Sequence, residues 1–185
     1  MSATPVFFTS CHVCHPSLAN DNLAGVAVAT FLARALAEET PYYTYRFVYA
    51  PGTIGAITWL ARNQERIDQV KHGLVLACAG DSGQLTYKQS RRGDAEIDRV
   101  LRHVLSASER PHRVTEFTPY GYDERQYGSP GFDLPVGSLT RTPCSDQGRS
   151  DGRLSARAKV QGVVWLECIV MPDGTVGDVK VTRSL

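Results

Sequence analysis

The sequence has no excess of charge of either sign. Its 185 residues include 20 basic and 19 acidic side chains, which gives a formal net charge of +1. Nucleic acids and anionic membranes bind strongly basic surfaces, and this balance indicates neither partner. No apolar run approaches the length of a membrane span, and the first five residues lack the basic and apolar regions of a secretory signal. We therefore expect a cytoplasmic protein with no nucleic-acid partner and no membrane span.

Cysteine is also scarce. The chain has five cysteines, an odd number without the spacing of a disulfide framework, so reduced thiols in a cytoplasmic protein are the expected state. Hydrophobic residues make up 42% of the chain, which is enough for a sizeable core. The length predicts one domain, or one domain with an appendage.

Strand-like apolar runs alternate with helix-like periodic segments as far as residue 142. Strands are predicted at 6–11, 45–50, 73–79, 84–89, 113–117 and 135–142, and helices at about 21–38, 54–63 and 94–108. The apolar positions of the third helix, from Ile97 through Val100 and Val104 to Leu105, are predicted to face inward. The stretch 119–135 is typical of a surface loop. This order of elements favours a mostly parallel α/β sheet with helices on both faces.

The composition changes after Pro143. Residues 144–159 are mostly small, polar or charged and are predicted to form a linker between a main domain at 1–143 and a terminal segment at 160–185. That segment alternates apolar and polar residues on both sides of a Pro-Asp-Gly-Thr turn, which predicts a β-hairpin. Because an isolated hairpin is marginal in water, we expect this one to dock on another surface.

The richest concentration of reactive side chains lies in residues 10–25, between the first strand and the first helix. Two thiols, two histidines and a carboxylate occur there: Cys11, Cys14, His12, His15 and Asp21. Such a set at the carboxyl end of a strand is where an α/β enzyme holds a metal ion. The same residues contain Cys-x-x-Cys-His, which is also a haem-attachment signature, or a pair of redox thiols. The residues alone leave these alternatives open, and Asp21 is equally suited to cap the following helix.

Ordered motifs within residues 5–143 resemble a bacterial family of aminopeptidase-like domains related to the co-catalytic zinc aminopeptidases. The motifs are His12, Cys14 to Gly25, Pro51 to Gly55, Gly80 to Gly83, Tyr87 to Arg92 and Tyr120 to Gly131. The resemblance implies a three-layer α/β/α sheet and zinc-dependent hydrolysis of a peptide or a related amide. It further implies that His12 and Asp81 are zinc ligands and that Asp21 is the carboxylate that bridges two zinc ions.

The sequence departs from that family in two places. The zinc aminopeptidases end their second strand with a pair of glutamates, one a base and one a ligand, where this chain has Gly52 and Thr53. They also take a histidine from a segment after the last strand, and no histidine follows Cys144. The resemblance therefore implies an incomplete domain with impaired hydrolysis. Missing flanks would leave sheet edges bare, which favours self-association.

The Tyr-rich loop supplies further candidates. Glu124 is a candidate catalytic base, and Arg91, Tyr122 and Arg125 are candidate contacts for a substrate. The structural alternatives are that Glu124 pairs with a nearby arginine, that Arg91 lies in a solvated turn, and that the tyrosines simply pack. Asp81, in Gly-Asp-Ser-Gly, also suits a turn.

Residues 156–185 resemble the opening hairpin of the TonB C-terminal domain. This resemblance implies an alternative function of another class, a non-catalytic interaction protein that adds a strand to the sheet edge of a partner. Zinc content discriminates the two hypotheses, whereas a haem protein would show a Soret band.

Overall fold

The computed structural model describes residues 4–14, 19–141, 165–170 and 176–183. Its main sheet has six strands in the order β2-β1-β3-β6-β4-β5. The strands are β1 (Val6–His12), β2 (Thr44–Ala50), β3 (Val70–Leu76), β4 (Leu85–Lys88), β5 (His112–Thr115) and β6 (Val136–Thr140). All neighbouring pairs are parallel except β4 and β6. The predicted mostly parallel α/β sheet is therefore confirmed.

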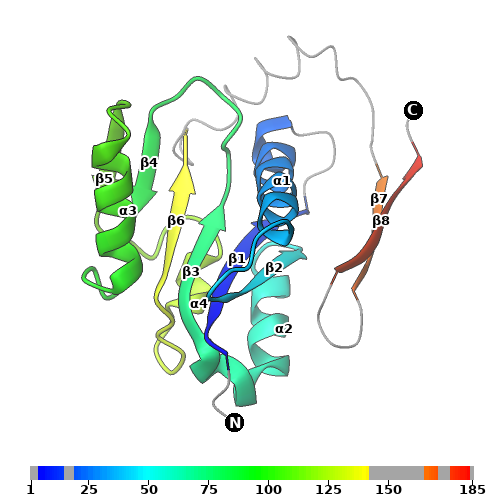
Figure 1. Cartoon of the computed structure of the whole chain (residues 1–185). Helices are drawn as coiled ribbons and strands as arrows, with labels where there is room; N and C mark the ends of the chain where they lie inside the picture. Colours follow the sequence, from blue (N-terminus) through cyan, green and yellow to red (C-terminus); the bar gives the residue numbers. More distant parts are fainter. Residues whose placement is uncertain (1–3, 15–18, 142–164, 171–175, 184–185) are drawn as a thin grey trace.

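Helices cover both faces of this sheet (Figure 1). Helices α1 (Gly25–Ala37) and α3 (Glu96–Ala107) lie on one face, and α2 (Ile54–Arg62) and α4 (Glu124–Tyr127) lie on the other. Two further short segments, η1 (Ala19–Ala24) and η2 (Gln64–Gln69), precede α1 and β3. Helix α4 lies inside the stretch that was predicted to be a loop. The result is the expected three-layer α/β/α arrangement.

Strand β1 runs through the middle of the core and sends alternate side chains to the two faces. Phe8 packs against Trp59 of α2 and Tyr127 of α4, with ring centroids 4.5 and 4.8 Å apart. Ser10, two residues on, bonds the Tyr127 hydroxyl at 3.0 Å. Cys11 faces the opposite layer, where its thiol donates to the carbonyl oxygen of Gly25 in α1. The same alternation directs His12 toward the layer of α2 and α4.

The prediction that a helix starts at about residue 21 is wrong, because α1 begins only at Gly25. Asp21 and Asn22 have non-helical backbone angles, and Asp21 does not cap the helix. Both side chains are buried and directed to partners on neighbouring strands rather than to the helix backbone. Partners distant in sequence thus overrode a local capping signal.

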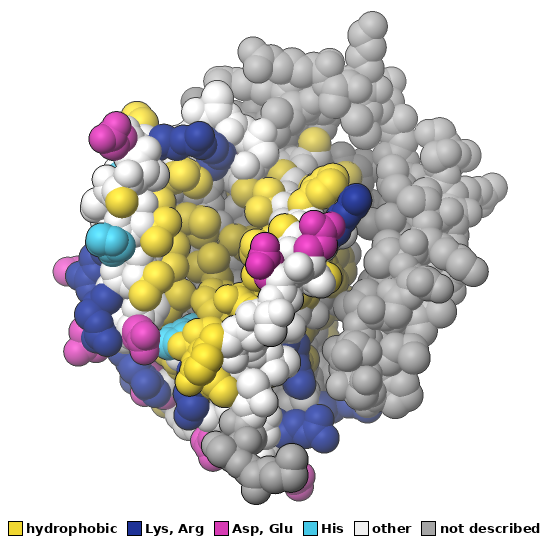
Figure 2. Space-filling model, in the orientation of Figure 1, with side chains coloured by type: hydrophobic (Ala, Val, Ile, Leu, Met, Phe, Trp, Pro, Cys, Tyr) yellow, Lys and Arg dark blue, Asp and Glu magenta, His cyan; other side chains and the backbone are white. Residues whose placement is uncertain are grey.

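The predicted inward face of α3 is only partly buried. Ile97 and Leu105 are 2% and 5% exposed, whereas Val100 and Val104 are 46% and 53% exposed, which corrects the prediction for the latter pair. On α1, Phe31 is also exposed, at 69%. Figure 2 shows apolar side chains in the hollow between these two helices. The two helices stand apart over the sheet, so side chains on their facing flanks reach solvent.

The C-terminal hairpin is confirmed as a local element. Strand β7 (Trp165–Val170) pairs antiparallel with β8 (Val176–Arg183) in a sheet of their own. The predicted linker at 144–159 lies outside the described residues. Within the described part of the chain, no helix is both long enough and apolar enough to span a bilayer.

Candidate functional site

The candidate site lies where β1, β2 and β3 end. The chain leaves β1 through α1 to reach β2, and leaves β2 through α2 on the other face to reach β3. Connections that depart to opposite faces from neighbouring strands open a crevice at their carboxyl ends. The segments that follow the three strands therefore meet at this edge of the sheet.

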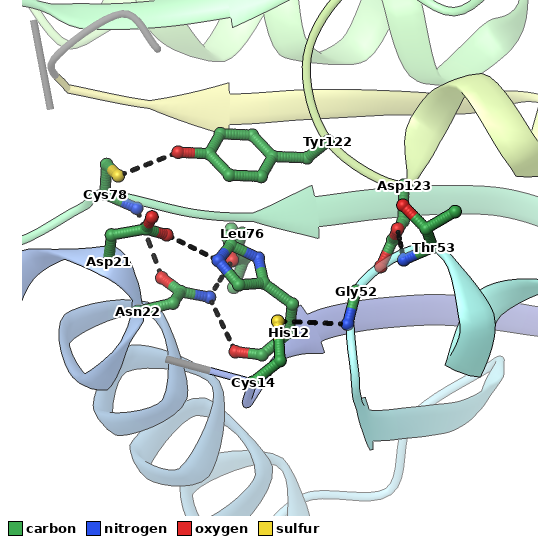
Figure 3. A network of polar contacts seen from close by, with 10 residues as sticks. All are labelled: His12, Cys14, Asp21, Asn22, Gly52, Thr53, Leu76, Cys78, Tyr122 and Asp123. Carbon is green, nitrogen blue, oxygen red and sulfur yellow. Dashed lines mark hydrogen bonds and ion pairs between the residues drawn. The ribbon is translucent and has the colours of Figure 1, made fainter. Parts of the chain in front are cut away.

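His12 and Asp21 are in direct contact at this edge (Figure 3). The imidazole Nε2 meets a carboxylate oxygen of Asp21, and the two residues are 3% and 6% exposed. His12 is the last residue of β1 and Asp21 belongs to η1, so the loop after β1 folds back over the strand end. The structure thus brings together two of the three predicted metal ligands.

Asn22 ties this loop to the neighbouring strand. Its amide donates to the carbonyl oxygen of Leu76 at 2.9 Å, and its side-chain oxygen accepts from the backbone N–H of Cys78 at 3.2 Å. Gly25 leaves the room for this: a Cβ on Gly25 would lie 2.7 Å from the Asn22 amide nitrogen and 2.7 Å from the Leu76 oxygen. The Asn-Asp-Asn-Leu-Ala-Gly motif therefore has a structural reason for its second asparagine and its glycine.

Tyr122 covers His12 from the α4 side. The two rings stack with centroids 4.8 Å apart and an interplanar angle of 16°. The tyrosine hydroxyl bonds the Cys78 thiol at 3.0 Å. Tyr122, a predicted substrate contact, thus lies directly against the imidazole (Figure 3).

Asp123 lies beside the site, whereas the sequence analysis favoured its neighbour Glu124 as the candidate base. One of the Asp123 carboxylate oxygens accepts from the backbone N–H of Thr53 at 2.7 Å, at the start of α2. The side chain lies on the same side of the crevice as His12 (Figure 3). Burial raises the pKa of Asp123, and the Thr53 hydrogen bond and the nearby His12 and Arg125 oppose that rise. The only available signal was its position beside Glu124, and adjacency cannot tell which carboxylate faces the site.

The place expected to carry the glutamate pair borders His12. The backbone N–H of Gly52 donates to the Cys14 sulfur at 3.2 Å. A Cβ on Gly52 would lie 3.6 Å from the Cβ of His12. Arg125 also reaches this place and donates to the Thr53 hydroxyl at 3.3 Å. Position 52 is therefore next to the predicted ligands, but glycine supplies no side chain there.

Asp81 lies in a turn after β3 and is linked to the site through Asn20. Its two carboxylate oxygens accept from the Asn20 amide at 2.9 Å and the Gly83 backbone N–H at 2.7 Å. Over the described ranges, no three His, Cys, Asp or Glu side chains form a group that could hold a metal ion. The structure therefore shows His12 and Asp21 in contact, and Asp81 hydrogen-bonded to Asn20, the residue before Asp21.

The two remaining candidates lie away from His12. Glu124 is completely buried and forms an ion pair with Lys88 of β4. Arg91 contacts the carbonyl oxygen of Gly128 at 3.4 Å and lies 3.9 Å from the carboxylate of Asp133, both beyond α4. Glu124 is therefore paired as its alternative expected, but with a lysine rather than an arginine, and the half-exposed Arg91 fits the solvated turn.

The thiols of Cys11 and Cys14 do not point to the same side of β1, and only one of them is accessible to solvent. Cys11 is 1% exposed and faces α1, and burial raises its pKa to about 12. Cys14 is exposed and contacts Gly52 on the other side of β1. A haem or redox pair requires two accessible thiols, so this arrangement does not support those alternatives. His15, the histidine of that signature, lies outside the described residues.

Solved structures of other proteins share this fold. An aminopeptidase from Aneurinibacillus sp. strain AM-1 matches with a TM-score of 0.65 at 17% identity, over 76% of this chain and 36% of that one. A peptidase M28 precursor from Shewanella amazonensis matches with a TM-score of 0.60 at 19% identity, over 80% of this chain and 34% of that one. The fold resembles that of the M28 aminopeptidases.

The chain belongs to the family described as a domain of unknown function, DUF4910, whose model matches residues 2–149. It is 51% identical over 131 residues to a putative polysaccharide biosynthesis protein with aminopeptidase-like domain from Clostridium acetobutylicum, which covers 71% of this chain and 30% of that protein. A crystal structure of a putative peptidase from the same species has a TM-score of 0.74 at 47% identity, over 77% of this chain and 33% of that one. The predicted family resemblance is confirmed, and the chain spans about a third of these relatives.

Proposed function

We propose that this chain carries a zinc-dependent aminopeptidase-type site for peptide or related amide bonds, with impaired hydrolysis. The observation that carries the proposal is the buried contact between His12 and Asp21 at the crevice of the sheet. The relatives support it, because one has an aminopeptidase-like domain and another is a putative peptidase.

The chemistry of the two residues fits zinc. An imidazole nitrogen and a carboxylate oxygen are both common zinc ligands. Catalytic zinc normally has three protein ligands, so the pair needs a third. Asp81 remains the proposed third ligand, and its hydrogen bonds from Asn20 and Gly83 would orient the carboxylate.

A bound zinc ion would lower the pKa of a water molecule and polarise a substrate carbonyl. Hydrolysis also needs a group that accepts the proton of that water. Gly52 and Thr53 have no acidic side chain for this step, Glu124 is enclosed by its ion pair with Lys88, and Asp123 has one carboxylate oxygen held by the Thr53 backbone N–H. Slow hydrolysis is therefore expected even when zinc is bound.

The test is the zinc content of the purified full chain, measured by elemental analysis after equilibration with zinc and removal of the free ion. We expect stoichiometric zinc in the wild type and its loss in His12→Ala and in Asp21→Ala. His103→Ala is the matched control, because His103 is exposed on α3. Absence of zinc from the wild type, or zinc that survives both site variants, would refute the proposal.

A zinc-free wild type would favour the second candidate function, strand addition by the C-terminal hairpin. Within the described residues, β7 and β8 form strand pairs only with each other, and the proposed interaction is the addition of this hairpin to the sheet edge of a partner.

A further inference from the structure

A buried ion pair lies beneath the loop that carries Tyr122. Lys88 is the last residue of β4 and Glu124 is the first residue of α4, and their side chains are 15% and 0% exposed. The Lys88 ammonium also donates to the carbonyl oxygen of Tyr120 at 2.7 Å. Charged side chains are almost never buried unless they are paired. The pair therefore fixes the end of β4 and the start of α4 relative to each other.

Glu124 continues this contact into the loop backbone. The carboxylate oxygen that meets Lys88 also accepts from the backbone N–H of Tyr122 at 3.2 Å. Gly121 has a φ of +143°, and a Cβ there would lie 2.6 Å from that oxygen and 2.6 Å from the Lys88 nitrogen. The backbone thus lies directly on the ion pair, and no side chain fits between them.

The loop held in this way ends on the imidazole. The Tyr122 ring stacks on His12, and its hydroxyl reaches Cys78 after β3. The contacts run without a break from Lys88 through Glu124 and Tyr122 to His12. The imidazole is thereby confined between the Tyr122 ring on one side and its contact with Asp21.

We propose that Glu124 is a positioning residue for His12, which acts through Tyr122 and takes no part in the chemistry. This inference rests on the proposed function only in so far as His12 is a zinc ligand. It gives Glu124 a role that the sequence did not suggest and explains why a carboxylate next to the site is sealed from solvent. Partners of a ligand histidine orient its ring, and their loss commonly weakens metal binding by about 10–100-fold.

The test compares His12 in the full chain by NMR, in which His12→Ala identifies its ring resonances. Stacking on Tyr122 displaces these resonances from those of a free histidine. We expect Glu124→Gln to move them toward their position in Tyr122→Leu, which removes the stacked ring. Tyr122→Phe keeps the ring and is the matched control. Zinc affinity is expected to fall by about 10–100-fold in Glu124→Gln and Tyr122→Leu.

A second control breaks an exposed ion pair. Asp133→Asn removes the partner of Arg92, with which it pairs at 3.0 Å with both side chains nearly half exposed, and should leave the His12 resonances and zinc affinity unchanged. If Glu124→Gln fails to fold, Lys88→Met combined with Glu124→Gln takes its place, because it leaves no unpaired buried charge. A folded variant with wild-type His12 resonances would overturn the inference. Zinc-free wild type would refute the proposed function alone, since the resonances report on the ring without metal.

Discussion

Replacement of Asn22 by alanine tests how the site loop is held to the sheet. Asn22 is 3% exposed, and its side chain is the partner of two backbone groups at the end of β3, the Leu76 carbonyl and the Cys78 N–H. Alanine would leave both groups buried without these partners, at a cost of roughly 1–3 kcal/mol each. We therefore expect Asn22→Ala to lower the free energy of unfolding by about 2–6 kcal/mol, a large part of the roughly 5–15 kcal/mol that stabilises a typical protein.

The measurement is equilibrium unfolding in urea, and the control is Asn63→Ala. Asn63 also donates to a backbone carbonyl, that of Trp59 at 2.8 Å, but it lies at the end of α2 and is only partly buried. Water can replace that bond, so the control should cost only about 0.5–1.5 kcal/mol. If Asn22→Ala costs no more than Asn63→Ala, the reasoning that Asn22 anchors the loop is refuted.

Three further predictions concern thiols, pH and the missing carboxylate. In the native protein at pH 8, an alkylating reagent should modify Cys14 well before Cys11, because burial raises the pKa of Cys11 from 9.0 to about 12 and so depletes its thiolate; peptide mapping by mass spectrometry checks this, and equal rates would contradict it. Burial lowers the pKa of His72 below 6.5, so the unfolded chain binds a proton that the folded chain does not, and stability should fall as the pH drops from about 6.5 toward the folded pKa. Urea midpoints across that range should show a shallower slope in His72→Gln, and an unchanged slope would count against the assignment. Gly52→Glu should tighten zinc binding by at least about tenfold, because position 52 borders His12; an unchanged affinity would show that a carboxylate there does not reach the ion.

Local patterns predicted the elements well because neighbouring residues encode them. The short apolar run at 6–11 placed β1, and the Gly-Asp-Ser-Gly turn marked the end of the segment after β3. The same reasoning failed at Asp21, which contacts His12 at the end of β1 instead of capping α1. It also failed at α4, whose four residues are too few for a periodic pattern.

The site itself was predicted only in part. His12 and Asp21 lie nine residues apart in one motif, and their contact was expected from the family resemblance. Asp123 bonds Thr53 across 70 residues, and Tyr122 stacks on a histidine at the other end of the domain. No spacing in the sequence specifies such contacts, because they depend on how β1, α2 and α4 pack.

The sequence by itself determined the alternation of strands and helices, the turn residues and the family, since these depend on local propensity and on ordered motifs. Only the tertiary structure decided where each of two adjacent carboxylates lies. The packing of α4 against the sheet places Asp123 on the Thr53 backbone N–H at the start of α2 and buries Glu124 on Lys88. A residue's chemistry is written in the sequence, whereas the direction in which its side chain points is set by what the rest of the chain packs against it.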